Sequence, residues 1–184
     1  MHIDQGWIST ATRLASPNVD ARPDESDISL LVIHNISLPP GQFGGGHVNE
    51  LFTNQLNPNA HPYFAEIADL KVSAHVLIDR EGVVTQFVPF HHRAWHAGVS
   101  QFEGRSACND YSIGIELEGT DSMSYTDRQY ACLAEMTQCL MAKYPSLTAK
   151  CIAGHSDIAP GRKTDPGSAF DWARFNALIE QRLM

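Results

Sequence analysis

The segment of residues 154–167 carries three side chains whose chemistry could be used together: His155, Lys163 and Asp165. Imidazole and carboxylate groups bind metal ions, and a lysine ammonium can stabilise developing negative charge. Because Asp165 precedes a proline, its backbone is biased towards an extended conformation, in which Lys163 and Asp165 project to the same side. The segment therefore indicates either part of a hydrolytic metal site or a surface loop held by a salt bridge, and alone it does not separate the two.

A catalytic zinc ion needs three protein ligands and an open position for water. His34 could be the third ligand, because it ends the apolar run of residues 30–34. Such a run is typical of a strand buried on both faces, and α/β sheets commonly bind ligands at the carboxyl ends of their strands. His34, His155 and Asp165 are thus one candidate metal set, although a histidine at a strand end is often structural.

Residues 91–96 hold three histidines and Trp95, and form a rival candidate for a metal cluster. His92 and His96 have the i, i+4 spacing of ligands on one helix face. A proline before the segment and a glycine after it argue against a stable helix, and no H-E-x-x-H motif is present. We therefore favour a substrate-facing loop in which Trp95 forms an apolar wall.

Residues 112–118 alternate with period two, so the apolar side chains share one face of a strand and Glu116 and Glu118 share the other. If the second face lines a cleft, Glu116 is suited to act as a general base towards water activated by a metal ion. The alternative is an exposed strand carboxylate, and this is what we expect of Glu118.

Periodicity and turn residues predict the elements that must position these groups. Helices are expected at 48–56, at 63–70, from Thr126 to residue 144, and after a cap at Asp171. Strands are expected at 30–34, 73–79, 83–88, 112–118 and 150–154, with a hairpin turn at 79–82. Residues 1–29 are expected to be irregular, and 89–110 to form a long functional loop. Without repeats or linkers, residues 1–184 are predicted to form one mixed α/β domain.

Composition excludes several classes of protein. The chain has 184 residues, of which 43% are hydrophobic and 18% charged, and a net charge of -8. Without a basic block, nucleic acid is not an expected partner. The N-terminus lacks a signal-peptide pattern and no early apolar run could span a membrane, so a cytoplasmic protein without a membrane partner is expected. The four cysteines form no C-x-x-C pair and no G-x-S-x-G elbow occurs, which disfavours a cysteine metal site and serine hydrolysis.

Taken together, these features resemble the zinc-dependent type-2 N-acetylmuramoyl-L-alanine amidases. The likeness is greatest to the branch of this family that acts on 1,6-anhydro muropeptides in peptidoglycan recycling. It implies a central mixed β-sheet flanked by helices, as in the type-2 amidase or peptidoglycan-recognition-like fold. The stretches that carry it follow one another in the expected order: residues 31–40, 73–75, 93–98, 112–121 and 154–167.

The resemblance implies roles for the candidate residues. His34, His155 and Asp165 would hold Zn²⁺, whereas His75, His91, His92 and His96 would not be ligands. Glu116 would take the proton of the attacking water and pass it to the leaving amine, and Lys163 would stabilise the oxyanion. The bond cut would join the lactyl carbonyl of muramic acid to the amine of L-alanine in a small anhydro-muropeptide. Oligomeric state is left open.

The resemblance also implies substrate contacts at Asn35, Lys71, Trp95 and Arg105. Relatives have arginine at the positions of Lys71 and Ala107, where it would grip stem-peptide carboxylates bidentately, and lysine is not an equal substitute. Arg105 is expected to compensate. Two alternatives stay open: an amidase that acts on intact peptidoglycan, either phage-type or exported, and a non-catalytic peptidoglycan-binding module on the same fold.

Overall fold

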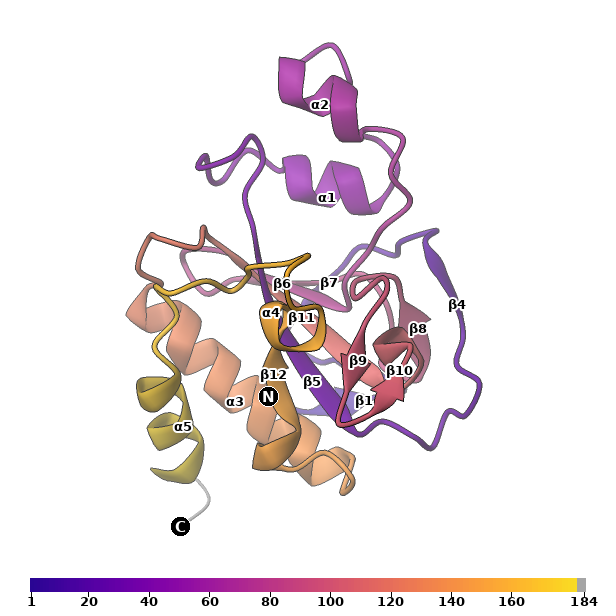
Figure 1. Cartoon of the computed structure of the whole chain (residues 1–184), viewed down its shortest axis with the longest axis vertical. Coiled ribbons are helices and arrows are strands. Elements are labelled where there is room, and N and C mark those ends of the chain that lie inside the picture. The colour runs from indigo at the N-terminus through magenta and orange to yellow at the C-terminus, as the bar shows by residue number, and fades with distance from the viewer. Residues whose placement is uncertain (182–184) are drawn as a thin grey trace.

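The apolar run that begins at Leu30 forms the strand β5 (Leu30–Ile36) of a six-stranded mixed sheet in the computed structural model, which describes residues 1–181 (Figure 1). Four neighbouring strands of this sheet are parallel: β12 (Ile152–Gly154), β5, β11 (Ser112–Glu118) and β6 (Val76–Ile78). Strand β7 runs antiparallel to β6 through the predicted hairpin, and β3 pairs parallel with β7. The mixed sheet is thus confirmed, in the order β12 (Ile152–Gly154), β5, β11 (Ser112–Glu118), β6 (Val76–Ile78), β7 (Val84–Gln86) and β3 (Thr12–Arg13).

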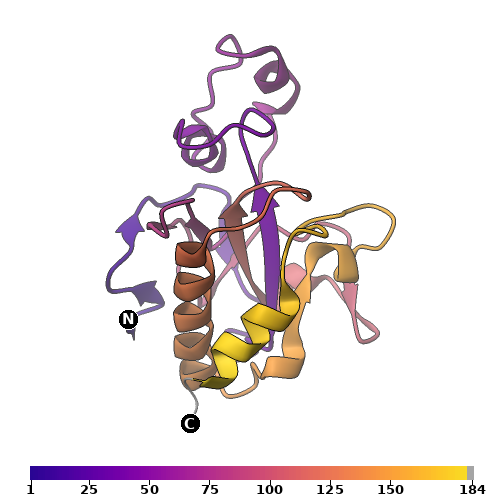
Figure 2. The same ribbon diagram turned by 90° about the vertical axis from the view of Figure 1, so that its left-hand side faces the viewer.

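Two helices, α3 (Asp127–Lys143) and α5 (Trp172–Gln181), lie side by side against one face of the sheet (Figure 2). The predicted capping box starts α3, since the Thr126 hydroxyl accepts from the Gln129 amide and the Gln129 side chain accepts from the Thr126 amide. The Asp171 carboxylate caps α5 by accepting from the backbone N–H at residue 174, at 2.9 Å. Both helix starts confirm predictions from local sequence.

The alternation of β11 separates the hydrophobic core from the polar face of the sheet. Ile113, Ile115 and Leu117 are fully buried in the core that α3 and α5 cover. Glu116 projects from the opposite face, where it lines a cavity together with residues of α1 (His47–Phe52) and α2 (Pro62–Ile67). These two helices pack in a second apolar cluster with residues of β6, of the segment after β7 and of β8 (His92–Ala94). Consequently the polar face of β11 lies between two packed cores.

Most of the short elements lie where the sequence predicted irregular chain. The strand predicted at 150–154 is shorter than expected, because a 3₁₀ helix occupies its first two residues and only residues 152–154 pair in the sheet. Strands of two or three residues have too few positions to show a period, so alternation cannot reveal them. Helices α1 and α2 are also shorter than the predicted 48–56 and 63–70. Within residues 1–181, no helix is both long and apolar enough to cross a bilayer. The additional elements are β1 (Ile3–Asp4), β2 (Trp7–Ile8), β4 (Val19–Ala21), β8 (His92–Ala94), β9 (Gln101–Phe102), β10 (Arg105–Ser106), α4 (His155–Ile158), and the 3₁₀ helices η1 (Cys108–Asp110) and η2 (Ala149–Cys151).

Candidate active site

The register of three neighbouring parallel strands brings the candidate groups together. Glu116 on β11 is paired directly with His34 on β5, so their side chains lie beside each other on the same face. On the other side of β5, Gly154 of β12 pairs with Ile33, which places the next residue, His155, at the level of His34. Two ligand candidates and the candidate base therefore come from adjacent strands, although more than a hundred residues separate the first from the last.

Asp165 reaches this group from the loop that follows α4. The Ser156 amide donates to the Asp165 carbonyl oxygen at 2.9 Å, which ties the loop to the start of α4. Gly154 permits this close approach, because a Cβ there would lie 2.8 Å from Cδ of Pro166. A larger residue at the end of β12 would push the Asp165 segment away from the histidines.

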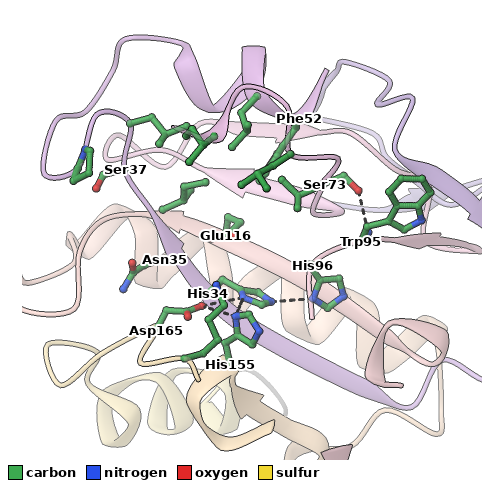
Figure 3. A pocket seen from close by; sticks show the side chains of 18 of the residues that line it. His34, Asn35, Ser37, Phe52, Ser73, Trp95, His96, Glu116, His155 and Asp165 are labelled. Atoms are coloured by element: carbon green, nitrogen blue, oxygen red, sulfur yellow. Dashed lines mark hydrogen bonds and ion pairs between the residues drawn. The ribbon is translucent and has the colours of Figure 1, made fainter. Parts of the chain in front are cut away.

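Three ligand atoms converge at this point, as Figure 3 shows. His34 Nδ1 lies 3.0 Å from His155 Nδ1 and 3.0 Å from Asp165 Oδ2, and His155 Nδ1 lies 3.1 Å from the same Oδ2. Ligands at 2.0–2.1 Å from a tetrahedral zinc ion are about 3.4 Å apart, so the three atoms are close to the spacing of a zinc site. Two imidazole nitrogens and one carboxylate oxygen are also a donor set that zinc uses.

The protonation of these groups suits a metal ligand set. Burial lowers the pKa of His34 to about 4, so its imidazole is neutral at physiological pH. Burial acts to raise the pKa of Asp165, but hydrogen bonds with His155 and His34 outweigh that effect and lower its pKa below the ordinary value. A neutral imidazole and an ionised carboxylate are the forms that coordinate a metal ion.

Glu116 has the surroundings of a proton-transfer group. Its side chain is buried, and burial, with the negative charge of Asp165, raises its pKa well above the ordinary value, while Lys163 opposes the shift. Its Oε2 has no hydrogen-bond partner among the described residues. A raised pKa brings the carboxyl closer to the pH at which it can both accept and return a proton.

All five of these side chains line one cavity of about 380 Å³. Its polar end holds the candidate ligand group, Glu116 and Lys163, while Trp95 lies at one side (Figure 3). The opposite wall is largely apolar, and its residues come from the end of β5, from α1, from α2 and from the segment after α2: Ile36, Leu38, Leu51, Phe52, Tyr63, Ile67, Leu70 and Val72. The cavity therefore combines a reactive polar end with an apolar wall.

The structure brings two of the four predicted substrate contacts to this cavity. Asn35 and Trp95 line it, and the Asn35 amide donates to Asp121 Oδ1 at 2.8 Å. Lys71 is exposed and lies between two lining residues without lining the cavity itself. Arg105 is committed elsewhere, to an ion pair with Asp27 and to the ring of Tyr111, with its guanidinium carbon 3.7 Å from the ring centroid. The structure thus does not place Arg105 where it could compensate for a missing arginine.

One expectation about a neighbouring side chain needs correction. Glu118 is only 6% exposed, and its carboxylate accepts from the Gly44 amide at 2.6 Å, so the expectation of an exposed carboxylate is wrong. The loop that carries Gly44 covers this end of β11, which strand periodicity does not reveal. His96 lies in irregular chain, lines the cavity and is not part of the candidate ligand group, as the prediction of a substrate-facing loop expects. It also contacts His34, with His34 Nε2 and His96 Nδ1 2.9 Å apart. The distance between these residues in the sequence gives no signal of that contact.

A possible metal site beside a buried carboxyl group of raised pKa, within a cavity of an α/β domain, is the arrangement of a hydrolase. Residues 24–168 match the profile of the N-acetylmuramoyl-L-alanine amidase family, and the chain belongs to this family. The predicted fold class and enzyme class are confirmed.

The similarity to individual members extends over nearly the whole chain. The 1,6-anhydro-N-acetylmuramyl-L-alanine amidase AmpD of Citrobacter freundii is 60% identical over 179 residues, which cover 97% of this chain and 95% of that protein. A crystal structure of a selenomethionine derivative of AmpD has a TM-score of 0.95 at 60% identity and covers 97% of this chain and 99% of that one. A structure of AmiD of Escherichia coli has a TM-score of 0.62 at 27% identity, and the match covers 86% of this chain and 60% of that one. That structure is a complex with anhydro-N-acetylmuramic acid-L-Ala-D-gamma-Glu-L-Lys.

Proposed function

We propose that the protein is a zinc-dependent 1,6-anhydro-N-acetylmuramyl-L-alanine amidase of peptidoglycan recycling. It would hydrolyse the amide bond between anhydro-N-acetylmuramic acid and L-alanine in small muropeptides. The observation that carries this proposal is the convergence of His34, His155 and Asp165 beside Glu116 in a cavity. The 60% identity to amidases of that name, over almost the full length of both chains, supports the choice of substrate. A cytoplasmic location stays a prediction.

The residues present fit a zinc ion. His34 and His155 would each contribute a ring nitrogen and Asp165 an oxygen, which leaves a fourth tetrahedral position for a reactant. When bound, zinc would supply Lewis acidity, which polarises a carbonyl group and makes water acidic near neutral pH. Carboxylate and imidazole ligands without thiolates also suit a catalytic role better than a structural one.

Glu116 and Lys163 would carry the proton and charge movements of the reaction. Glu116 would accept the proton of the attacking water and pass it to the alanine nitrogen as the C–N bond breaks, and its unpartnered Oε2 supports this role. Lys163 lines the same cavity, and its ammonium would stabilise negative charge that develops on the amide oxygen. Groups of this kind lower the activation free energy by about 3 kcal/mol in comparable sites.

Substrate orientation would depend on both ends of the cavity. Trp95 and the apolar wall offer surface against which the sugar and the lactyl group can pack, while the Asn35 amide offers a hydrogen-bonding group. Lys71 is near the rim, where its charge could attract a stem-peptide carboxylate at some distance. We therefore expect tight positioning of the scissile bond and looser selection of the peptide.

The test uses a defined anhydro-muramyl tripeptide and its non-anhydro counterpart, with mass spectrometry of the products. The proposal expects anhydro-muramic acid and free tripeptide, formed only by protein that contains zinc and faster from the anhydro substrate. Unchanged muropeptide in the presence of zinc-loaded protein would support a binding module instead. Preference for the non-anhydro compound, or release of peptide from intact sacculi, would support an amidase of peptidoglycan.

Metal analysis tests the ligand set separately. His34→Ala and Asp165→Ala should abolish zinc retention, whereas His91→Ala, in the rival cluster, should retain it. The reverse pattern would show that the 91–96 segment is the metal site and that the assignment is wrong.

A further inference from the structure

His96 lies between a candidate metal ligand and a serine hydroxyl. Its Nδ1 is 2.9 Å from His34 Nε2 (Figure 3), and its Nε2 is 3.1 Å from Ser112 Oγ. The ring of His96 stands edge-on to that of His34, with an interplanar angle of 86°. In this arrangement, rotation of the His34 imidazole about its Cβ–Cγ bond would break the contact with His96.

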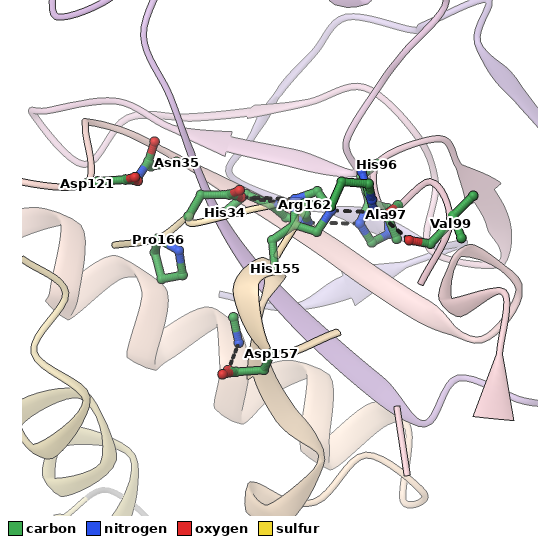
Figure 4. Close-up of polar contacts among 12 residues, drawn as sticks. His34, Asn35, His96, Ala97, Val99, Asp121, His155, Asp157, Arg162 and Pro166 are labelled. Carbon is green, nitrogen blue, oxygen red and sulfur yellow. Dashed lines mark hydrogen bonds and ion pairs between the residues drawn. The ribbon is translucent and has the colours of Figure 1, made fainter. Parts of the chain in front are cut away.

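The second candidate ligand, His155, contacts the residue that follows His96, namely Ala97. His155 Nε2 is 3.1 Å from the Ala97 carbonyl oxygen, which also accepts from an Nη of Arg162 at 2.6 Å (Figure 4). A carbonyl oxygen only accepts, so His155 Nε2 must carry the hydrogen. In the neutral ring the lone pair is then on Nδ1, which faces His34 and Asp165.

The same reasoning gives the tautomer of His34. Its Nδ1 faces His155 and Asp165, so a metal ion there requires the Nδ1 lone pair and leaves the hydrogen on Nε2. His96 Nδ1 must then accept that hydrogen, and His96 Nε2 donates to Ser112 Oγ. The donors and acceptors from Ser112 to His34 are therefore consistent with a single set of tautomers.

One side chain anchors the two outer partners together. Asn109 Oδ1 accepts from the backbone N–H of His96 at 3.1 Å and from that of Ala97 at 2.8 Å. On the other side, β11 leaves room for the ring, because a Cβ on Gly114 would lie 2.4 Å from His96 Cγ. Position and space are thus both provided for His96.

We propose that His96 and the Ala97 carbonyl, held by Asn109, are the positioning groups of the metal site. They set the tautomer and ring orientation of His34 and His155, so that both Nδ1 lone pairs point to one place. This inference rests on the proposed function, because it concerns the zinc site of the proposed amidase. The histidine-rich segment at 91–96 is then part of the metal site without supplying a ligand.

The test compares variants of His96 by zinc affinity, measured through competition with a chromophoric chelator. His96→Leu removes the acceptor and should weaken zinc binding about 10–100-fold, the usual cost of losing an outer-shell partner. His96→Asn is the matched control, since its Oδ1 can take the place of Nδ1, and it should regain most of the affinity. Asn109→Ala should weaken zinc in the same direction, while Asn109→Asp keeps the acceptor and should weaken it less.

The visible absorption spectrum of the Co²⁺-substituted protein provides a readout of ligand geometry, and thermal unfolding of the metal-free variants shows that they are folded. His96→Leu should change the cobalt bands and His96→Asn should restore them. Equal zinc affinities and spectra for the wild type and the folded His96→Leu variant would overturn the inference and leave the proposed function intact. Wild-type protein that binds one zinc ion but does not cleave muropeptide would refute the proposed function and not this inference.

Discussion

The contact between Gly114 and His96 allows a sharp prediction about a single methyl group. In Gly114→Ala the new Cβ would lie 2.4 Å from Cγ, 2.5 Å from Nδ1 and 2.7 Å from Cδ2 of His96. Non-bonded carbon atoms are most stable at about 3.5–4.0 Å, so the ring must move by about 1 Å. A shift of that size displaces the ring nitrogens from the positions at which they lie 2.9 Å from His34 Nε2 and 3.1 Å from Ser112 Oγ.

The expected magnitude follows from overpacking. Added methylene volume in a packed interior costs about 1–3 kcal/mol, which for a chain of this size lowers Tm by roughly 2–12 °C. Without the clash, Gly114→Ala would instead stabilise the protein by about 0.4–1 kcal/mol, because alanine restricts the unfolded chain. The sign of the effect therefore depends on whether the His96 ring is present.

A double-mutant cycle with His96→Ala isolates the contribution of the contact between residue 114 and the His96 ring. Urea and thermal unfolding of the metal-free proteins should show that Gly114→Ala is destabilising in the wild-type background and neutral or stabilising in the His96→Ala background. Gly114→Ala should lower zinc affinity in the wild-type background and should not lower it further when added to His96→Ala. An equal cost of Gly114→Ala in both backgrounds would refute the reasoning, since the clash would then involve other atoms.

Further predictions concern the chemistry of the cavity and its acid stability. Glu116→Gln should retain zinc and lower kcat about 10²–10⁴-fold; zinc loss instead would make Glu116 a ligand. Lys163→Met should lower kcat about 10²–10³-fold with little change in KM, and a pure KM effect would contradict the oxyanion role. Lys71→Arg should lower KM for an anhydro-muramyl tripeptide, and an unchanged KM would remove Lys71 from the site. The pKa of His34 is about 4 when folded, against 6.5 for the free side chain, so the unfolded state takes up the proton first as pH falls. From His34 alone, the free energy of unfolding of the metal-free protein should fall by up to about 3 kcal/mol between pH 6.5 and 4. The measurement is urea unfolding in the Glu116→Gln background, which removes the opposite effect of the raised Glu116 pKa. An unfolding free energy that does not change with pH would contradict the burial argument.

Local sequence determined the long elements and the chemical types in the site. Strand β11 and helix α3 could be predicted because each has enough residues to reveal a pattern. The strand has seven residues that alternate, and the helix has seventeen residues with a helical period and a capping box at the start. His34, His155 and Asp165 could be named as a candidate set because few residue types coordinate zinc and because these three follow predicted strands or lie in a Pro-containing loop. Their choice over the histidines of residues 91–96 rested on the resemblance to the amidase family. Short strands such as β3 could not be predicted, because two residues show no period.

Tertiary structure alone decided how these groups meet. The register of β12, β5 and β11 puts His155, His34 and Glu116 side by side, and register is set by pairing between distant segments, which local periodicity does not encode. The same packing buries Glu118 and directs Arg105 to Asp27, against expectation. The sequence by itself thus supplied the ligand types and the strands that bear them. Their convergence depends on the folded chain, because strand pairing brings His34 and His155 together and the loop after α4 adds Asp165.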